Sequence, residues 1–358
     1  MLRDLEGNII NLKEFPDALN NHRLIWGKSG SGKTWCCYRM IEEAVEQKKK
    51  CVIFDYSGSY TTKEQERSKF ASRDQTYVFD GNQPGITYWY TGKNVYSAFE
   101  EALIVALPFR GHRQREFLHK VMELLKEQEK ELTFASVISV LDGYVQGLTD
   151  DESKERGEKL LDIIGQYEKL DIIFRKKTPE MDKELEDNKL VTIMQFTELE
   201  GGTKKFLTEF MSALLWQSVK DEGNSADLHS VDYILYDEFQ NVALGKESTL
   251  GAMLREGRKC GLGVWLATQI LSNYKPEQID TLQQVDTMLL FQPSDRSMKG
   301  IAQLVDCEAW ESCRSALSDL QNGQAILKGK YSVNHNSKIW DIPIICVVDS
   351  KDNKNDFR

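Results

Sequence analysis

The sequence lacks any apolar run that approaches the roughly 18–20 residues of a membrane-spanning helix. Its first residues, Met1–Glu6, also lack the apolar core of a secretory signal peptide. The seven cysteines have neither a paired spacing nor the ligand spacing of a structural zinc site, so we expect reduced thiols packed as small apolar side chains. Together these absences predict a soluble cytoplasmic protein without a membrane partner.

The chain also lacks an excess of positive charge. Its 46 lysines and arginines against 56 aspartates and glutamates give a formal net charge of −10. A protein that only holds nucleic acid is more often basic, so this balance argues against a broad nucleic-acid-binding surface, although it allows a local basic channel. With 41% hydrophobic residues, the 358-residue chain can bury one large core or two smaller ones.

Short apolar segments alternate with segments of helical spacing over much of the chain. Cys51–Phe54 is a wholly apolar run, as expected of a strand that is buried on both faces. Strands separated by helices predict an α/β fold with a doubly wound, mostly parallel sheet. Further strands are predicted at Leu24–Trp26, Tyr77–Phe79, Ile86–Tyr90, Leu190–Phe196, Tyr233–Tyr236, Leu262–Thr268, Met288–Phe291, Gln324–Leu327 and Ile342–Val348.

The composition and hydrophobic spacing of the sequence change between residues 111 and 189. Glycine and proline are sparse there, and apolar residues recur at helical spacing. We therefore predict a helical-bundle insertion over 111–189, between a first part of the core at 1–110 and a second part at 190–348. Residues 1–22 are expected to be a short lead-in, and 349–358 a polar tail.

Residues 27–34 read GKSGSGKT, which matches the phosphate-binding pattern G-x-x-x-x-G-K-[ST]. Glycines let backbone N–H groups turn toward phosphate oxygens, and the helix that follows adds the positive end of its dipole. We expect Lys33 to reach the β- and γ-phosphates of ATP and the Thr34 hydroxyl to bind Mg²⁺. A turn without a ligand fits less well, because the loop follows a predicted strand and opens a predicted helix. The predicted nucleotide-binding residues are Gly27, Ser29, Gly30, Ser31, Gly32, Lys33 and Thr34.

Polar residues follow three of the predicted strands. Asp237 is placed to hold Mg²⁺ and Glu238 to activate the attacking water, unless they form only a surface turn. Gln269 is placed to contact the γ-phosphate or the water, or else to bond a loop. Asp55 is placed to support the magnesium or the water, or else to cap a turn. The presence of two consecutive carboxylates, Asp237 and Glu238, favours an enzyme that hydrolyses the nucleotide over a slow nucleotide-binding switch.

Four segments together resemble the HerA/FtsK superfamily of ring-forming ATPases, and HerA-like proteins most closely. They are GKSGSGKT at 27–34, CVIFDYSGSY at 51–60, YILYDEFQNV at 233–242 and REGRKCGLGVWLATQ at 255–269. The resemblance implies a RecA-like core, assembly into a hexamer and ATP-driven movement of DNA through a central pore. Only 26 residues precede the phosphate-binding loop, so we expect the N-terminal barrel of typical HerA proteins, which helps to dock a nuclease, to be absent. We therefore expect any nuclease or effector partner to be a separate protein.

The resemblance also implies roles for individual residues. Lys33 and Thr34 fall on nucleotide-binding positions, Asp237 on the metal position, Glu238 on the catalytic position, Gln269 on the sensor glutamine and Asp55 on the acidic position that closes the second strand. Arg258 falls on the arginine that acts on a neighbouring subunit, with Arg255 as second choice, whereas sequence physics alone favours a solvated helix end there. Ser59 departs from the pattern, which has an acidic residue before the tyrosine. Candidate DNA contacts in pore loops are Lys204, Lys205 and Lys246, the alternative being ordinary solvent-facing lysines.

The sequence therefore predicts a hexameric ATPase that couples Mg-ATP hydrolysis to translocation of double-stranded DNA. A second hypothesis is a ring ATPase that assembles or activates a protein partner, such as a nuclease or a defence effector. A small-molecule phosphotransferase is a third, disfavoured because no lid-like arginine cluster is evident and Glu238 favours water as the acceptor.

Overall fold

The computed structural model describes residues 2–12, 20–79, 90, 94–109, 112–170, 189–223, 231–270, 275–294, 297–306, 308–334, 336 and 338–349. The chain divides into two compact units, which are treated separately below. Unit 1 comprises residues 1–78, 188–197 and 231–358, and unit 2 comprises residues 79–187 and 198–230.

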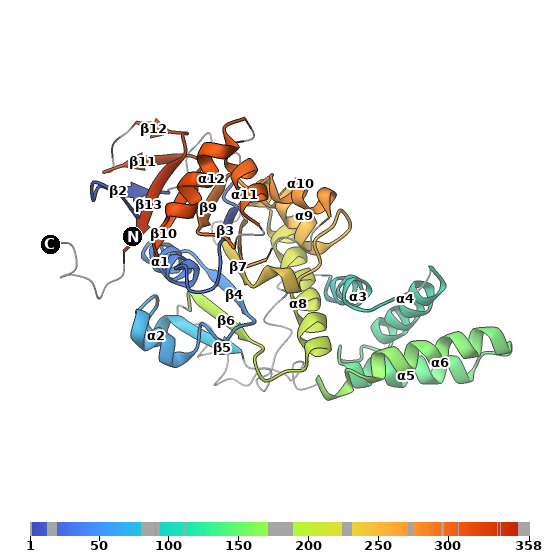
Figure 1. Ribbon diagram of the computed structural model, residues 1–358. Helices are drawn as coiled ribbons and strands as arrows, with labels where there is room; N and C mark the ends of the chain where they lie inside the picture. The colour runs from blue at the N-terminus through green and yellow to red at the C-terminus, as the bar shows by residue number, and fades with distance from the viewer. Residues whose placement is uncertain are drawn as a thin grey trace. The chain divides into compact units, whose positions relative to one another are not determined.

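One sheet of 13 strands forms the frame of unit 1 (Figure 1). Its order is β12-β11-β2-β1-β13-β10-β9-β3-β8-β7-β4-β6-β5. The strands of the first half of the chain are β1 (Leu2–Asp4), β2 (Ile9–Asn11), β3 (Arg23–Trp26), β4 (Cys51–Asp55), β5 (Thr76–Phe79) and β6 (Val191–Gln195). The others are β7 (Tyr233–Asp237), β8 (Gly263–Thr268), β9 (Thr287–Phe291), β10 (Gln324–Lys328), β11 (Tyr331–Val333), β12 (Ile339–Trp340) and β13 (Ile344–Val348).

The centre of this sheet is parallel, as the alternation of strands and helices predicted. Strands β9, β3, β8, β7, β4 and β6 pair in parallel, and their apolar side chains are buried along most of their length. The register places Trp26 beside Thr268 and Leu290, and Asp237 beside Ala267. The carboxyl ends of these strands therefore meet along one edge, where ligands bind in open α/β sheets.

The N-terminal residues differ from the predicted lead-in. Residues 2–4 and 9–11 form β1 and β2, which extend the sheet in antiparallel pairing; β1 lies beside β13 with Leu2 opposite Val348. Strands of three residues show no clear period in a sequence, and their partner here lies more than 300 residues away. The antiparallel extension continues through β10 and β13 on one side of β1 and β11 and β12 on the other.

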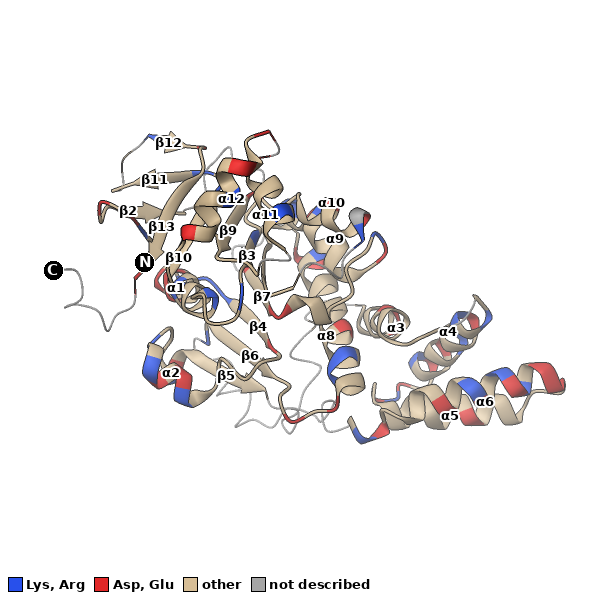
Figure 2. Cartoon of the chain, in the orientation of Figure 1, with Lys and Arg blue, Asp and Glu red and all other residues tan. Residues whose placement is uncertain are grey.

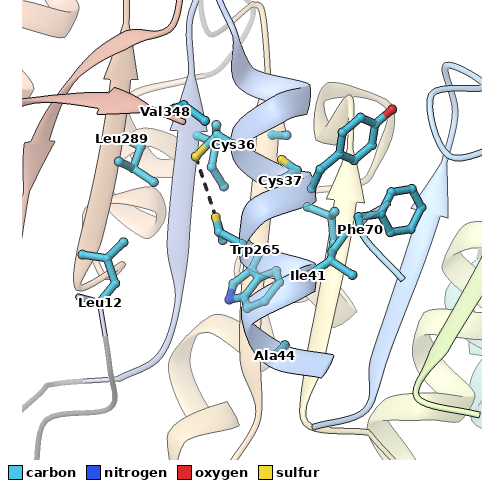
Figure 3. Close-up of a cluster of buried hydrophobic side chains, with 14 of the residues drawn as sticks. Leu12, Cys36, Cys37, Ile41, Ala44, Phe70, Trp265, Leu289 and Val348 are labelled. Atoms are coloured by element: carbon cyan, nitrogen blue, oxygen red, sulfur yellow. Dashed lines mark hydrogen bonds between the residues drawn. The ribbon is translucent and has the colours of Figure 1, made fainter. Parts of the chain in front are cut away.

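Helix α1 (Lys33–Glu46) contributes one side of the main hydrophobic core. Cys36, Cys37, Ile41 and Ala44 lie on its buried face, near Trp265 of β8 (Figure 3). The thiols of Cys36, Cys37, Cys51 and Cys346 are buried and unpaired, as predicted for cysteines packed as small apolar side chains. Burial raises the pKa of the Cys36 and Cys346 thiols to about 12, so they stay protonated at neutral pH.

Two further helices of unit 1 begin at residues whose side chains cap them. The side chains of Thr61 and Ser248 accept hydrogen bonds from backbone N–H groups in the first turns of α2 (Thr62–Ser68) and α9 (Thr249–Glu256). The other helical segments are η1 (Arg73–Gln75), η4 (Phe239–Asn241), η5 (Gly257–Cys260), α10 (Pro276–Leu282), α11 (Met298–Val305) and α12 (Trp310–Asp319).

Unit 2 is helical where it is described. It contains α3 (Val95–Ala106), α4 (His112–Glu127), α5 (Phe134–Gln146), α6 (Asp151–Gly165) and α8 (Gly201–Glu222). Phe99, Phe134, Phe206 and Phe210 form an aromatic cluster that joins α3, α5 and α8. Basic and acidic residues alternate along α6 (Figure 2), which identifies its exposed face. This compact unit extends beyond the predicted insertion, because it includes α3 and α8.

Most of the predicted elements are present with shifts of a few residues at their ends. The predicted strand at Ile86–Tyr90 lies almost wholly outside the described residues, as do the charged run 180–187 and all of the C-terminal tail after Asp349. Within the described part of the chain, no helix combines the length and the apolar character that a membrane crossing requires.

Candidate active site

The loop between β3 and α1 has the shape of a phosphate cradle. Gly30 and Gly32 have positive φ angles of 74° and 111°, which side chains rarely adopt. A Cβ at Gly27 would lie 2.5 Å from Cβ of Phe291, so β9 packs directly against the start of the loop. The Ser31 hydroxyl is buried and makes no hydrogen bond within the described residues. An unsatisfied buried hydroxyl is costly, and a phosphate oxygen in the loop would satisfy it.

Lys33 is the first residue of α1, and its side chain folds back over this loop. Its Nζ donates a hydrogen bond to the Lys28 carbonyl oxygen over 2.9 Å, and the residue is only 8% exposed. Burial lowers the pKa of Lys33, while the carboxylates of Glu238 and Asp237 oppose that shift. Lys33 therefore lies within electrostatic reach of both carboxylates. Thr34 follows on the same first turn and is partly exposed.

Asp55 closes β4 and organises the loop that follows. Its fully buried carboxylate accepts backbone hydrogen bonds from Gly58 over 2.8 Å, Ser59 over 3.1 Å and Tyr60 over 3.0 Å. Burial raises the pKa of this carboxyl, and the three N–H groups oppose the shift. This geometry corresponds to the turn-capping alternative for Asp55, and it fixes the 56–60 loop beside the next strand end.

Asp237 closes β7 and is joined to that loop through Ser57. The Ser57 hydroxyl lies 2.5 Å from Oδ2 of Asp237, and its Oγ is 2.6 Å from Oγ of Ser59. Burial raises the pKa of Asp237 to about 7; the Ser57 hydrogen bond opposes this, and repulsion from Asp55 and Glu238 adds to it. A cation beside these carboxylates would relieve the repulsion.

Glu238 stands immediately after β7 in an uncommon backbone conformation. Its φ of 58° and ψ of 52° are left-handed, a conformation that costs energy for a residue with a Cβ. Gln240 donates to Oε2 over 2.6 Å, and Gln269 donates to Oε1. The side-chain oxygen of Gln240, Oε1, accepts a hydrogen bond from the Thr268 hydroxyl over 2.5 Å. This contact fixes which end of the Gln240 amide faces Glu238. The two oxygens of the Glu238 carboxylate are thus held by two amides, one from η4 and one from the segment after β8.

These residues together can supply hydrogen-bond donors for the phosphates of ATP and oxygen ligands for Mg²⁺. The phosphate cradle and Lys33 fit the phosphates, and Thr34 and Asp237 fit Mg²⁺, which usually binds one or two protein oxygens and the phosphates. Among the described residues, no group of three or more His, Cys, Asp or Glu side chains is placed to hold a metal ion by itself. When bound, the ion would neutralise phosphate charge, while the held carboxylate of Glu238 is suited to accept a proton from water.

The structure separates Arg258 from this edge of its own sheet. Arg258 lies on η5 before β8, whereas Gln269 follows the other end of the same six-residue strand. At about 3.3 Å per residue, the two ends are roughly 20 Å apart. Arg258 is exposed, and no hydrogen bond of its guanidinium is found among the described residues. Arg255 instead donates to the Lys246 carbonyl oxygen over 2.7 Å and holds that loop.

The three candidate DNA contacts belong to different units of the chain. Lys246 is exposed on a loop of unit 1 between η4 and α9. Lys204 and Lys205 lie in the first turn of α8 in unit 2, partly and largely exposed respectively.

Two residues that sequence reasoning did not select take part in the site. Ser57 joins the Asp55 loop to Asp237, and Gln240 holds Glu238. Each lies inside one of the four segments that carry the family resemblance, two residues after a carboxylate that was predicted to act in the site. A spacing of two residues does not show which way a loop side chain points, so the backbone conformation had to be known.

Comparison with known proteins gives a family for this arrangement. Residues 10–215 match the family model described as "Helicase HerA, central domain". A curated protein of Methanocaldococcus jannaschii named "Probable helicase MJ1565" is 22% identical over 87% of this chain. That match covers 60% of the M. jannaschii protein, so the chain spans less than two thirds of its length.

Solved structures share the fold. VirB4 of Thermoanaerobacter pseudethanolicus superposes with a TM-score of 0.64 at 13% identity, over 96% of this chain and 94% of that one. The bacterial conjugative coupling protein TrwBdeltaN70 superposes with a TM-score of 0.62 at 14% identity, over 92% and 86%. TrwB in complex with ADP and Mg²⁺ gives a TM-score of 0.58 at 13% identity, over 92% and 86%. The fold is therefore that of RecA-like P-loop ATPases.

Proposed function

Because this chain belongs to the family of the helicase HerA central domain, we propose that it is an ATP hydrolase whose ring-shaped assembly moves double-stranded DNA. The observation that carries hydrolysis is the position of Glu238. A strained backbone and two side-chain amides hold its carboxylate within electrostatic reach of Lys33, directly after Asp237 at the carboxyl end of β7. Strain that is held in this way is typical of functional sites.

The proposed division of labour follows from the contacts. Lys33 and the backbone N–H groups of residues 27–34 bind the phosphates, and Thr34 and Asp237 hold Mg²⁺. Gln269 and Gln240 orient Glu238, which accepts the proton of the attacking water. Asp55 and Ser57 position Asp237 rather than touching the nucleotide.

Assembly into a ring, which we propose to be a hexamer, is supported by Arg258. Its guanidinium is exposed and lies at the far end of β8 from its own site. An arginine in that position acts on phosphate only if another subunit brings its nucleotide to it. Arg255 is the weaker candidate, because its guanidinium is already bonded to the Lys246 carbonyl oxygen.

Movement of DNA is supported by the family and by the names of the relatives. The curated relative is named as a probable helicase, and two of the structural neighbours are a VirB4 protein and a conjugative coupling protein. Lys204, Lys205 and Lys246 are the proposed contacts to the phosphate backbone, since lysines on loops that line a pore track a duplex without reading its sequence.

A ring ATPase that acts on a protein partner, such as a nuclease or an effector, is the second candidate. The observation that favours it is the net charge of −10, which repels nucleic acid at long range. The two candidates differ in whether DNA accelerates hydrolysis.

The deciding experiment is steady-state ATPase activity with and without double-stranded DNA. Glu238→Gln serves as the blank, because it keeps the shape of the side chain but removes the proton acceptor. Strong stimulation by DNA that the variant lacks supports the translocase. Hydrolysis that is indifferent to DNA supports the protein-directed ATPase, and wild-type activity in Glu238→Gln overturns the assignment of the catalytic base.

A further inference from the structure

A cavity of about 800 Å³ adjoins the phosphate cradle, and neither Asp237 nor Glu238 lines it. Gly30, Gly32 and Trp35 line it from the loop and the start of α1. The turn between β1 and β2, residues 4–7, also lines it, as do residues 322–324 and 347–349. Its size is that of ordinary small-molecule sites.

Backbone hydrogen bonds fix these separate segments on one another. The Gly323 N–H donates to the Ser31 carbonyl oxygen over 2.9 Å, and the Val348 N–H donates to the Gly323 carbonyl oxygen over 2.9 Å. Val348 lies opposite Leu2 in the ladder between β13 and β1. A Cβ at Gly32 would lie 3.0 Å from Cα of Gly323, so the two backbones touch. The N-terminal turn is therefore built in a fixed relation to the phosphate cradle.

The turn itself is held by its own contacts. The Asp4 carboxylate accepts from the backbone N–H groups of Glu6 and Asn8 over 3.0 and 2.8 Å. Arg3 donates to the Gly7 carbonyl oxygen over 2.9 Å and forms an ion pair with Asp349 at 3.0 Å. The side chain carried at the tip of this ordered turn is Leu5, which is 63% exposed, the highest value among the large apolar residues described as exposed.

A single exposed leucine is ordinary on a protein surface. This one is informative because it borders the same cavity as Trp35, the residue after the predicted Mg²⁺-binding Thr34. An apolar residue and an aromatic residue at one cavity, next to a phosphate cradle, suit a flat ring that is covalently attached to phosphate.

We propose that this cavity is the subsite for the base of the nucleotide, and that Leu5 and Trp35 are the side chains that cover a purine ring there. The inference rests on the proposed function, because it requires that the phosphates lie on the 27–34 loop. It adds that the N-terminal hairpin, which the sequence presents as a lead-in, completes the nucleotide site.

The test compares two ligands that share phosphates and differ in the base. Binding of ATP and of inorganic tripolyphosphate is measured by calorimetry for the wild type, Leu5→Ser and Lys33→Ala. Ile342→Ser is the matched control, since Ile342 is 56% exposed and does not line this cavity. Leu5 is exposed on a turn, so its replacement leaves the core intact; Trp35→Leu supplies a second variant.

We expect Leu5→Ser and Trp35→Leu to raise the Kd for ATP roughly fivefold to tenfold, the range for losing contact with part of a large apolar side chain. Their Kd for tripolyphosphate should stay at the wild-type value, and Ile342→Ser should change neither. An unchanged Kd for ATP, or equal weakening of both ligands, overturns the base subsite. If the wild type binds neither ligand, or Lys33→Ala binds both normally, the proposed function fails instead.

Discussion

The side-chain amide of Gln240 donates a hydrogen bond to Oε2 of Glu238 over 2.6 Å. Because the side-chain oxygen of Gln240 accepts a hydrogen bond from the Thr268 hydroxyl, a 180° rotation of the amide would break that second hydrogen bond as well. Gln269 holds the other oxygen, Oε1. The carboxylate that is proposed to accept a proton from water is thus oriented by two amides, and each makes a separable contribution.

Replacement of Gln240 by alanine should lower kcat by roughly tenfold and leave KM for ATP nearly unchanged, because the variant loses orientation of Glu238 but no phosphate contact. Steady-state kinetics at saturating Mg²⁺ measures the split. Gln283→Ala, at an exposed glutamine, is the control and should match the wild type. A rise in KM without a fall in kcat would show that Gln240 shapes the nucleotide site rather than the base.

Ser57 provides the second prediction. Its hydroxyl is 2.5 Å from Oδ2 of Asp237, so Ser57→Ala removes the contact that orients the proposed magnesium carboxylate. We expect the Mg²⁺ concentration for half-maximal ATPase activity to rise roughly tenfold, with the activity recovered at high Mg²⁺. A magnesium titration at fixed ATP measures this, and Ser315→Ala on the exposed face of α12 is the control. Loss of activity that added Mg²⁺ does not restore would contradict the role.

The sequence located most of this site because of how parallel strands are arranged. Asp55, Asp237 and Gln269 each follow an apolar run, and the carboxyl ends of parallel strands meet at one edge. The phosphate-binding loop was recognisable because its glycines are needed for the positive φ angles that the structure shows.

Other parts of the site could not be predicted, for two physical reasons. The contacts of Gln240 and Ser57 depend on loop conformations, including the left-handed backbone of Glu238, that residue spacing does not determine. The pairing of β1 with β13 depends on contacts between the two ends of the chain, and β1, with three residues, is too short to show a period. The cavity beside Leu5 exists only once that pairing is made.

The ATPase activities of Arg258→Ala and Arg255→Ala should differ sharply. Arg258→Ala should lower ATPase activity by about 10³-fold or more if its guanidinium acts on the γ-phosphate of a neighbour, and Lys259→Ala next to it should not. Mixing Arg258→Ala with Lys33→Ala should restore part of the activity, because the second variant supplies the arginine to intact sites of the first. Full activity of Arg258→Ala alone would exclude this role.

Lys204 and Lys205 should affect the response to DNA rather than hydrolysis itself. The double change to alanine should weaken DNA binding and reduce the slope of log affinity against log salt by about one to two, as expected when one or two phosphate contacts are lost. ATPase activity without DNA should stay near the wild-type value. Binding measured at several salt concentrations checks this, with Lys299→Ala of α11 as the control. An unchanged slope would assign both lysines to ordinary solvent exposure.

His22 makes the stability of the protein depend on pH below neutrality. Its imidazole is buried, and its Nδ1 accepts the Val264 N–H over 3.0 Å, which requires the unprotonated ring. Burial lowers the pKa of His22 from 6.5 to about 4, against a weaker opposing contribution from the backbone of Leu254. Between pH 6.5 and 4, His22 is therefore protonated in the unfolded chain but not in the folded chain.

The sign follows from that difference in protons. Because the unfolded state binds more protons in this window, the free energy of unfolding rises with pH, and acidification from pH 7 to pH 4 should remove about 3 kcal/mol through His22. His22→Gln has no such proton, so its stability should fall less steeply across the same window, whatever its stability at pH 7. Urea unfolding at several pH values measures both slopes. Parallel slopes for the wild type and His22→Gln would mean that His22 is protonated in the folded protein and that its contact with Val264 does not persist in solution.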